Sequence, residues 1–265
     1  MRDDLYEWLQ TATLLAKHAN KTMRQWADSD RRVEYKTDLS PVTQADTAIN
    51  QMVIDTISER FPHHGVLGEE QSANEHTTGP LWVCDPIDGT IPFTIGVGVA
   101  AFSIAVVEDG RPVVAVCSDP WVDVTWSAVR GEGTFRNNQR VHVNQTTKMV
   151  DAYIGLTGTP NMFPPEHATA LFHTLAPNCR KVLFLGSCVA EGVRVADGGF
   201  AASVFMNNAV VDVAATTLLV EEAGGKVTDL WGNNQRYDQP TRGALSSNGH
   251  LHDTLLEQIA HTCHQ

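Results

Sequence analysis

Six consecutive residues, Asp85-Pro86-Ile87-Asp88-Gly89-Thr90, bring together groups that could do chemistry. Two carboxylates three residues apart flank a turn fixed by proline, so both can point to one side and share hard cations, which prefer oxygen ligands. The carbonyl of Ile87 can face the same space. Gly89 lets the backbone approach a ligand, and the N–H groups of Gly89 and Thr90 can cradle a phosphate oxygen. The hexapeptide therefore predicts metal-assisted phosphate chemistry.

A pair of glutamates and one distant aspartate extend this hypothesis. Glu69 and Glu70 follow Gly68 upstream of the hexapeptide, and Asp212 lies far downstream before an alanine-rich stretch. Each has a structural interpretation when taken alone: a pair of glutamates is common on surfaces, and Asp212 could be the N-cap of its helix. Short motifs carry weight only in combination.

The amino-acid composition and net charge bear on which classes of molecule this chain can bind. The chain has 265 residues, 42% of them hydrophobic, which suits one large domain or two fused smaller ones. Its formal charge of −12, without a basic run, argues against nucleic acid or an anionic membrane as partner. An anionic substrate is compatible with this charge if bound cations reverse the local field.

Cysteine usage and the N-terminal residues favour a cytoplasmic location. The five cysteines include no Cys-x-x-Cys pair, which argues against a disulfide framework and a structural zinc site. The first twenty residues contain Asp3, Asp4 and Glu7 and do not resemble a signal peptide, and no segment is long enough to span a bilayer.

Hydrophobic periodicity predicts two helices in the N-terminal third. Leu5, Trp8 and Leu9 begin an apolar stripe at helical spacing from about residue 3 to 26. Thr43, with Asp46 three residues later, resembles a capping box at the start of a second helix that ends near residue 61.

The rest of the chain alternates between predicted strands and helices. Short β-rich runs joined by turns indicate an antiparallel meander, with strands expected at 81–84, 102–107, 113–118 and 124–129. Beyond residue 148 we expect extended chain at 152–156, a helix at 165–175, a strand at 181–185, and helices at 188–196 and 212–223. Gly224-Gly225 would stop the last of these helices.

The order of these motifs resembles the inositol monophosphatase superfamily. Gly-Glu-Glu at 68–70 precedes the hexapeptide, and Asp212 precedes an alanine-rich helix that ends in Glu-Ala-Gly-Gly. Further similar segments at 36–46 and 221–229 extend the resemblance over nearly the whole chain.

The resemblance implies an α/β (α+β) fold, a layered α-β-α-β-α sandwich of the sugar-phosphatase type with an antiparallel N-terminal sheet and a mixed C-terminal sheet. An N-terminal half, residues 1–148, would carry most metal ligands. The C-terminal half, residues 149–265, would carry Asp212 and the residues that determine specificity. The two halves are expected to pack as one unit, and relatives of this type are commonly homodimers.

Residue roles follow from the resemblance by motif. Two or three magnesium ions would be bound by Glu69, Asp85, the carbonyl of Ile87, Asp88 and Asp212. Glu69 and Thr90 would orient and deprotonate the attacking water, while Asp46 supports Thr90 through a hydrogen bond. Gly89 and Thr90 would bind the phosphate. Lys36 would lie near the metals.

Three residues expected to contact the substrate depart from the family's usual pattern. Ser187 and Cys188 follow Gly186 in a turn that matches the Gly-Thr-Ala of inositol phosphatases better than the Gly-Asp of histidinol phosphatases. Phe205 stands seven residues before Asp212, where both groups usually hold a glutamate. After Thr90, the usual Thr-Asn-Phe is replaced by Ile-Pro-Phe.

The sequence thus predicts a phosphoric monoester hydrolase, an inositol-phosphate phosphatase-like enzyme. Its substrate would be a small phosphorylated metabolite: inositol phosphate or a related sugar or polyol phosphate. Histidinol phosphate is an alternative. A sugar or nucleotide bisphosphate is another, because the ring of Phe205 could stack on a base. An alternative of a different class is a non-catalytic protein that binds metal or phosphate.

Overall fold

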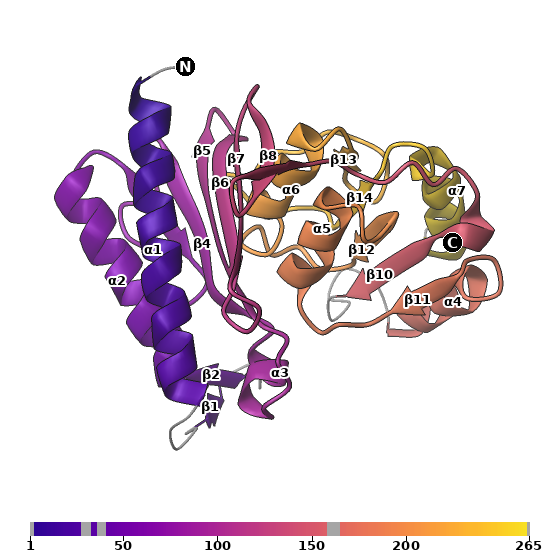
Figure 1. Ribbon diagram of the computed structural model, residues 1–265, viewed down its shortest axis with the longest axis horizontal. Coiled ribbons are helices and arrows are strands. Elements are labelled where there is room, and N and C mark those ends of the chain that lie inside the picture. Colours follow the sequence, from indigo (N-terminus) through magenta and orange to yellow (C-terminus); the bar gives the residue numbers. More distant parts are fainter. Residues whose placement is uncertain (1–2, 28–32, 36–40, 158–164, 264–265) are drawn as a thin grey trace.

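The computed structural model describes residues 3–27, 33–35, 41–157 and 165–263 and is built from five layers (Figure 1). Two helices cover one face of a seven-stranded sheet, two more fill the space between that sheet and a five-stranded sheet, and a last pair covers the far side. The predicted α-β-α-β-α sandwich is confirmed.

The outer pair of helices, α1 (Asp3–Ala27) and α2 (Gln44–Arg60), forms as predicted. On α1, Trp8, Ala12 and Leu15 belong to the buried stripe that packs on the sheet. The side chain of Thr43 caps α2, and the carboxylate of Asp46 accepts a hydrogen bond from the Thr43 N–H at 2.8 Å. The short strands β1 (Val33–Tyr35) and β2 (Pro41–Thr43) precede α2.

The N-terminal sheet follows the order of its strands in the chain. Its members are β3 (Gly65–Gly68), β4 (Leu81–Asp88), β5 (Ala101–Glu108), β6 (Arg111–Asp119), β7 (Val124–Val129), β8 (Gly133–Arg136) and β9 (Gln139–Val141). Neighbouring strands are antiparallel except for β3 and β4, which are parallel. The predicted meander is therefore confirmed, with one parallel edge strand added.

The predicted turn inside the hexapeptide was wrong, because β4 runs on through Pro86 to Asp88. Pairing of β4 with β3 stops at Cys84, so the missing N–H of Pro86 costs no hydrogen bond on that side. Pairing with β5 shifts its register between Asp85 and Asp88, which accommodates the extra residues as a bulge does.

The C-terminal sheet is mixed, as predicted, with the order β11-β10-β12-β14-β13. Its strands are β10 (Tyr153–Thr157), β11 (Lys181–Leu183), β12 (Ala202–Phe205), β13 (Lys226–Thr228) and β14 (Ala244–Ser247). β10 is parallel to β11 and β12, and the other pairs are antiparallel. A 3-10 turn, η1 (Met149–Asp151), precedes it, and α4 (Pro165–Leu175) and α7 (His252–Cys263) cover its outer face.

The inner helices are α5 (Cys188–Ala196), which matches its predicted bounds, and α6 (Ala214–Glu222). Asp212 is not the N-cap of α6: that position is Val213, whose side chain makes no capping bond. One oxygen of the Asp212 carboxylate lies within 4.8 Å of oxygens of Asp85 and Asp88.

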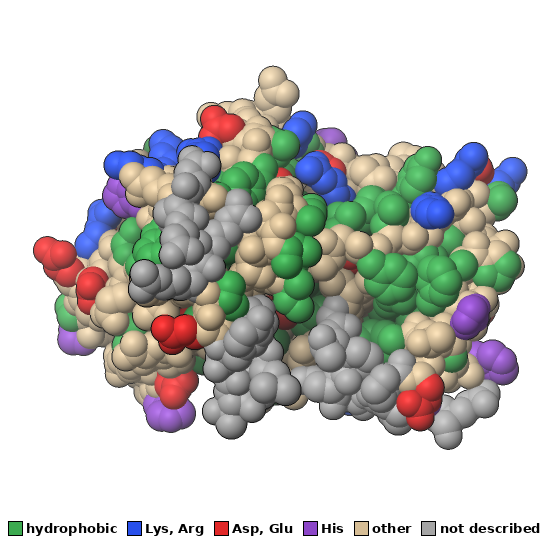
Figure 2. Space-filling model, turned by 90° about the horizontal axis from the view of Figure 1, so that it is seen from below, with side chains coloured by type: hydrophobic (Ala, Val, Ile, Leu, Met, Phe, Trp, Pro, Cys, Tyr) green, Lys and Arg blue, Asp and Glu red, His purple; other side chains and the backbone are tan. Residues whose placement is uncertain are grey.

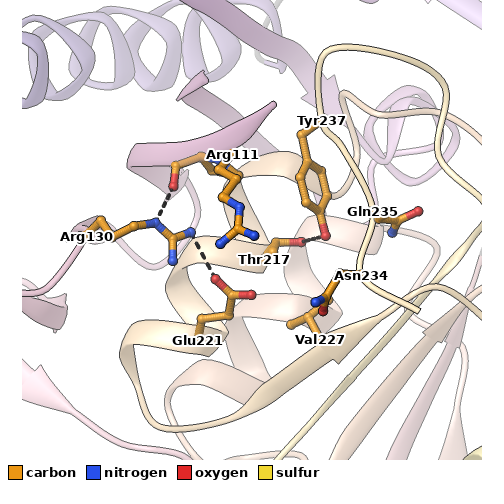
Figure 3. A pocket seen from close by; sticks show the side chains of 9 residues that line it. Arg111, Arg130, Thr217, Glu221, Val227, Asn234, Gln235 and Tyr237 are labelled. Carbon is orange, nitrogen blue, oxygen red and sulfur yellow. Dashed lines mark hydrogen bonds and ion pairs between the residues drawn. The ribbon is translucent and has the colours of Figure 1, made fainter. Parts of the chain in front are cut away.

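Polar contacts join the two halves where α6 meets β7 and β8. Arg130 donates to the carbonyl of Pro112 and to the carboxylate of Glu221, each at 2.9 Å (Figure 3). The hydroxyl of Thr134 donates to the carbonyl of Leu219. These contacts bind α6, in the C-terminal half, to the N-terminal sheet. The domain boundary at 148/149 stays a prediction.

The four described cysteines, at positions 84, 117, 179 and 188, are buried and free. Among the described helices, none is both long and apolar enough to cross a bilayer.

Candidate active site

The irregular end of β4 brings Asp85 and Asp88 to the same face of the sheet. Leu81 and Val83 pack toward α5 and α6, and alternation places Asp85 on that face too. Residues three apart in a regular strand point to opposite faces, but the register shift returns Asp88 to the face of Asp85 and leaves Ile87 on the side of α1 and α2.

Asp212 joins these two carboxylates from the segment that precedes α6. One carboxylate oxygen from each of Asp85, Asp88 and Asp212 lies within 4.8 Å of the other two. Ser103, the partner of Asp85 on β5, donates a hydrogen bond to the carbonyl of Val211 at 3.2 Å and so fixes the approach of Asp212. Residues more than a hundred positions apart thus form one acidic cluster.

Burial and mutual repulsion disfavour negative charge in this cluster. Burial, then the charges of Glu69, Asp88 and Asp212, raises the pKa of Asp85 well above its usual range. Burial also raises the pKa of Asp88 to about 6, although three hydrogen bonds oppose the shift. A divalent cation would relieve this repulsion, and a set made only of oxygen donors suits hard cations such as Mg²⁺. The donors present therefore fit a metal site.

The N-terminus of α5 holds Asp88. Its carboxylate accepts hydrogen bonds from the N–H groups of Cys188 at 3.2 Å and Val189 at 2.7 Å, and from the hydroxyl of Ser187, which is also the N-cap of α5. The orphan N–H groups of a helix terminus favour a negative charge. Ser187, predicted to contact substrate, is thus buried and bonded to Asp88.

Gly89 is required by its left-handed backbone conformation and by its close approach to Ser187 and Val99. It has φ +86°, and a Cβ there would lie 3.0 Å from both the Cβ of Ser187 and the carbonyl oxygen of Val99. It is the N-cap of the short helix α3 (Thr90–Thr94). Only glycine adopts this backbone conformation without strain.

The hydrogen bond predicted between Asp46 and Thr90 is not formed. The hydroxyl of Thr90 donates to the carbonyl of Ile87 at 3.1 Å. Oδ2 of Asp46 instead accepts hydrogen bonds from the backbone N–H and the hydroxyl of Thr43 in the cap of α2. The other oxygen of Asp46, Oδ1, is buried and lacks a hydrogen-bond partner within the described ranges. Burial raises the pKa of Asp46 to about 6.

Glu69 lies beside the cluster without belonging to it. Its backbone N–H donates to the carbonyl of Cys84 at 3.1 Å, which places it next to the end of β4, and its charge raises the pKa of both Asp85 and Asp88. Lys36, expected near the metals, lies outside the described residues.

A cleft of about 460 Å³ opens beside the cluster. It is lined by Asp88, Ile91, Pro92, Leu156, Thr157, Ala168, Phe184, Gly186, Cys188, Phe205, Met206, Asn207 and Asp212. Cys188 and Phe205 therefore line it as expected of substrate residues, whereas Ser187 does not. Its wall is largely apolar, and on the face of the molecule shown in Figure 2 hydrophobic side chains gather over the C-terminal half.

The thiol of Cys188 is poorly suited to act as a nucleophile. Burial, followed by the negative charge of Asp88, raises the pKa of the Cys188 thiol well above its usual value. Because the thiolate is the reactive form, the thiol stays protonated near neutral pH.

Glu191 was missed by the sequence analysis. It is fully buried on α5, where its carboxylate accepts hydrogen bonds from the N–H of Leu185 at 2.9 Å and the hydroxyl of Ser203 at 3.3 Å. A signal was present: Glu191 lies three residues after Cys188 and four before Val195, on the apolar stripe of a predicted helix. Burial raises its pKa to about 8.

Comparison with known proteins agrees with this geometry. The model of the inositol monophosphatase family matches residues 4–264. The chain belongs to the inositol monophosphatase family. It is 34% identical over 261 residues to a histidinol-phosphatase of Mycobacterium tuberculosis, an alignment that covers 95% of this chain and 97% of that protein.

Solved structures of the family share the fold over nearly its full length. An inositol monophosphatase of Thermotoga maritima superposes with a TM-score of 0.87 at 27% identity, covering 97% of this chain and 98% of that one. SaIMPase-II superposes with TM-scores of 0.80 bound to inositol monophosphate and 0.81 bound to 2'AMP, at 27% and 28% identity. These alignments cover 96% of this chain and 92% and 93% of the SaIMPase-II chains.

Membership establishes the reaction class. The chain is a phosphoric monoester hydrolase of a metal-dependent family, and its three clustered aspartates form a set of oxygen donors that could hold a metal ion.

Proposed function

We propose that this enzyme is a magnesium-dependent phosphatase whose substrate is inositol phosphate or a related sugar or polyol phosphate. The observation that carries the proposal is the cluster formed by Asp85, Asp88 and Asp212, whose carboxylate oxygens lie within 4.8 Å of one another at the edge of the cleft. A phosphate ester in that cleft would have its phosphoryl group next to the cluster.

The residues that would bind two or three Mg²⁺ ions are Glu69, Asp85, the carbonyl of Ile87, Asp88 and Asp212. Such ions, when bound, neutralise the phosphate, activate a water and stabilise the departing oxygen. The structure supports this ligand set through the closeness of the three aspartates and the influence of Glu69 on the pKa values of Asp85 and Asp88.

The remaining roles belong to groups around the end of β4. We assign Glu69 to accept a proton from the attacking water, and Thr90 to orient that water through its hydroxyl. Asp46 has one buried oxygen with no hydrogen-bond partner in the described part of the chain, so it can accept a bond from Thr90 when substrate is bound. The N–H groups of Gly89 and Thr90 would bind phosphate oxygens.

The first test concerns the metal cluster. Asp88→Asn keeps the size of the side chain and one of the two oxygens that accept hydrogen bonds at the start of α5, but it removes the charge. We therefore expect phosphate release to fall at least about a hundredfold with Mg²⁺ present. Asp123→Asn, at an exposed position with 87% of its side chain accessible, is the matched control and should retain activity. Full activity of Asp88→Asn, with its circular dichroism unchanged, would contradict the metal assignment.

The second test concerns the substrate. A polyol needs hydrogen-bonding groups, whereas this cleft presents Phe184, Phe205 and Met206, which favour a substrate with a flat or apolar organic part. Of the bisphosphate alternatives, this observation supports a nucleotide rather than a sugar as the second candidate, consistent with the 2'AMP bound by SaIMPase-II. Phosphate release should be compared for inositol phosphate, histidinol phosphate, fructose bisphosphate and adenosine bisphosphate. The substrate with the highest kcat/KM decides among them.

The same panel tests the non-catalytic alternative. If the protein binds magnesium and phosphate but hydrolyses no monoester, it is a binding protein that has kept the fold.

We further propose a cytoplasmic homodimer. The free, buried cysteines at the described positions support a reducing compartment. The residues Ile95 and Val97, 68% and 49% exposed, offer apolar surface for a second copy. Light scattering after size-exclusion chromatography would give the mass of the assembly.

A further inference from the structure

A second, smaller cavity lies away from the acidic cluster, where α6 meets the N-terminal sheet (Figure 3). It encloses about 80 Å³ and is lined by Arg111, Pro112, Arg130, Thr217, Glu221, Val227, Asn234, Gln235 and Tyr237. None of these residues lines the cleft beside the acidic cluster. Since a water molecule occupies ~30 Å³ in the liquid, this cavity has room for one small ion.

Two arginines supply hydrogen-bond donors that the protein does not use. Arg111 is exposed, and its guanidinium makes neither an ion pair nor a hydrogen bond to any residue that the structure describes. Arg130 donates through Nε to Pro112 and through Nη2 to Glu221, so its Nη1 has no acceptor in the described ranges. Figure 3 shows both guanidinium groups beside Glu221.

Tyr237 adds a buried donor. The residue is 5% exposed, and its hydroxyl accepts a hydrogen bond from the hydroxyl of Thr217 at 3.0 Å. Burial raises the pKa of Tyr237 to about 12, so the phenol keeps its proton at neutral pH. That proton can be donated into the cavity, where the side chain of Gln235 also contacts the Tyr237 hydroxyl.

The charge of the cavity has the opposite sign to that of the protein. Arg111 and Arg130 face one carboxylate, Glu221, which is already paired with Arg130 at 2.9 Å. One positive charge is therefore left over, in a chain whose formal charge is −12. Guanidinium groups match the geometry of oxyanions through parallel hydrogen bonds.

We propose that this cavity is a binding site for a small tetrahedral oxyanion, phosphate or sulfate, distinct from the catalytic cleft. Arg111, Nη1 of Arg130 and the hydroxyl of Tyr237 donate to its oxygens. Thr217 orients the Tyr237 hydroxyl from α6, and the N–H of Tyr237 donates to the carbonyl of Gly110 at the start of β6. A bound anion therefore ties together β6, α6 and the segment around residue 237.

The test is calorimetric titration of the full-length protein with inorganic sulfate, at constant ionic strength set with chloride. With magnesium removed, the clustered carboxylates of the catalytic cleft repel anions, so the wild type should bind one sulfate. Arg111→Gln should weaken this binding by at least about tenfold, and Tyr237→Phe by about threefold, the losses typical of one charged and one neutral hydrogen-bonding group.

The matched control is Arg180→Gln, which removes the same charge from an exposed ion pair with Asp151 elsewhere on the C-terminal half. Its affinity for sulfate should stay within about twofold of the wild type, since a distant exposed charge is screened by salt. Repeating the titrations with inorganic phosphate and with acetate separates a site for tetrahedral anions from one for any anion: acetate should bind much more weakly.

Titration with phosphate in the presence of Mg²⁺ distinguishes the proposed anion site from the catalytic cleft. The wild type should then bind two phosphates, and Arg111→Gln should keep the one in the catalytic cleft together with full hydrolytic activity. The proposal is overturned if the magnesium-free wild type shows no saturable binding, if Arg111→Gln binds sulfate as well as the wild type, or if Arg180→Gln weakens binding equally.

Discussion

The backbone N–H of Leu185 donates a hydrogen bond of 2.9 Å to the buried carboxylate of Glu191. This bond fixes the loop between β11 and α5, and the end of that loop carries Ser187, whose hydroxyl donates to Asp88. The carboxylate also occupies the space above Gly155, where a Cβ would lie 2.6 Å from Oε2. Glu191 therefore positions Asp88 without contacting it.

Two substitutions of Glu191 test whether it acts by accepting the hydrogen bond from Leu185. Glu191→Ala leaves the N–H of Leu185 and the buried hydroxyl of Ser203 without this acceptor, and we expect kcat to fall about tenfold or more with stability reduced by about 2–4 kcal/mol. Glu191→Gln keeps an acceptor for Leu185 and should restore kcat to within about threefold. Equal losses of kcat in both variants would contradict the positioning role, because Glu191→Gln keeps the acceptor for the N–H of Leu185.

The wild type and Glu191→Gln should differ in how the free energy of unfolding depends on pH. The pKa of Glu191 is raised from 4.5 to about 8, so between these values the folded protein holds a proton that the unfolded chain has lost. Stability from this group is therefore greatest at acid pH and declines as pH rises through 8, by at most about 5 kcal/mol. Urea unfolding at pH 5 and 8.5 should show Glu191→Gln gaining on the wild type at the higher pH. A difference that does not change with pH would contradict the burial of this carboxyl.

Magnesium affinity should weaken as pH falls. The pKa of Asp88 is raised to about 6 and that of Asp85 well above its usual range, mainly by burial, and metal ligands must be ionised. Below about pH 6 a cation must displace protons from these groups, so its apparent Kd should rise by about tenfold per pH unit for each proton released. Calorimetry of Mg²⁺ binding without substrate, from pH 8 to 5.5, avoids the titration of the phosphate ester itself. A constant Kd over this range would contradict the raised pKa of the Asp88 and Asp85 carboxyl groups.

Gly89 and Gly224 offer a matched pair of left-handed glycines. Both have φ near +90°, but a Cβ at Gly89 would meet Ser187 and Val99 at 3.0 Å, whereas nothing lies within 4 Å at Gly224. Gly224→Ala should cost only backbone strain, about 1 kcal/mol, and leave activity intact. Gly89→Ala should also displace Asp88 and lower kcat/KM about tenfold or more. If the two variants have the same activity, the packing of Gly89 against Ser187 does not matter for catalysis.

Local sequence was sufficient for much of the fold. The apolar spacing of residues 3–27, the capping box at Thr43 and Asp46, and the bounds of α5 depend on neighbours within a few positions. The acidic site residues were also identified by type and order, because the motifs that contain them are short and contiguous.

Tertiary structure decided how those residues are held. Ser187 reaches Asp88 across 99 positions in the sequence, and Asp212 meets Asp85 only because β4 and α6 face each other across one core. The hexapeptide became an irregular strand because its pairing with β3 ends at Cys84. Such contacts depend on register and packing between distant segments, and no local pattern of residues encodes the position of the partner.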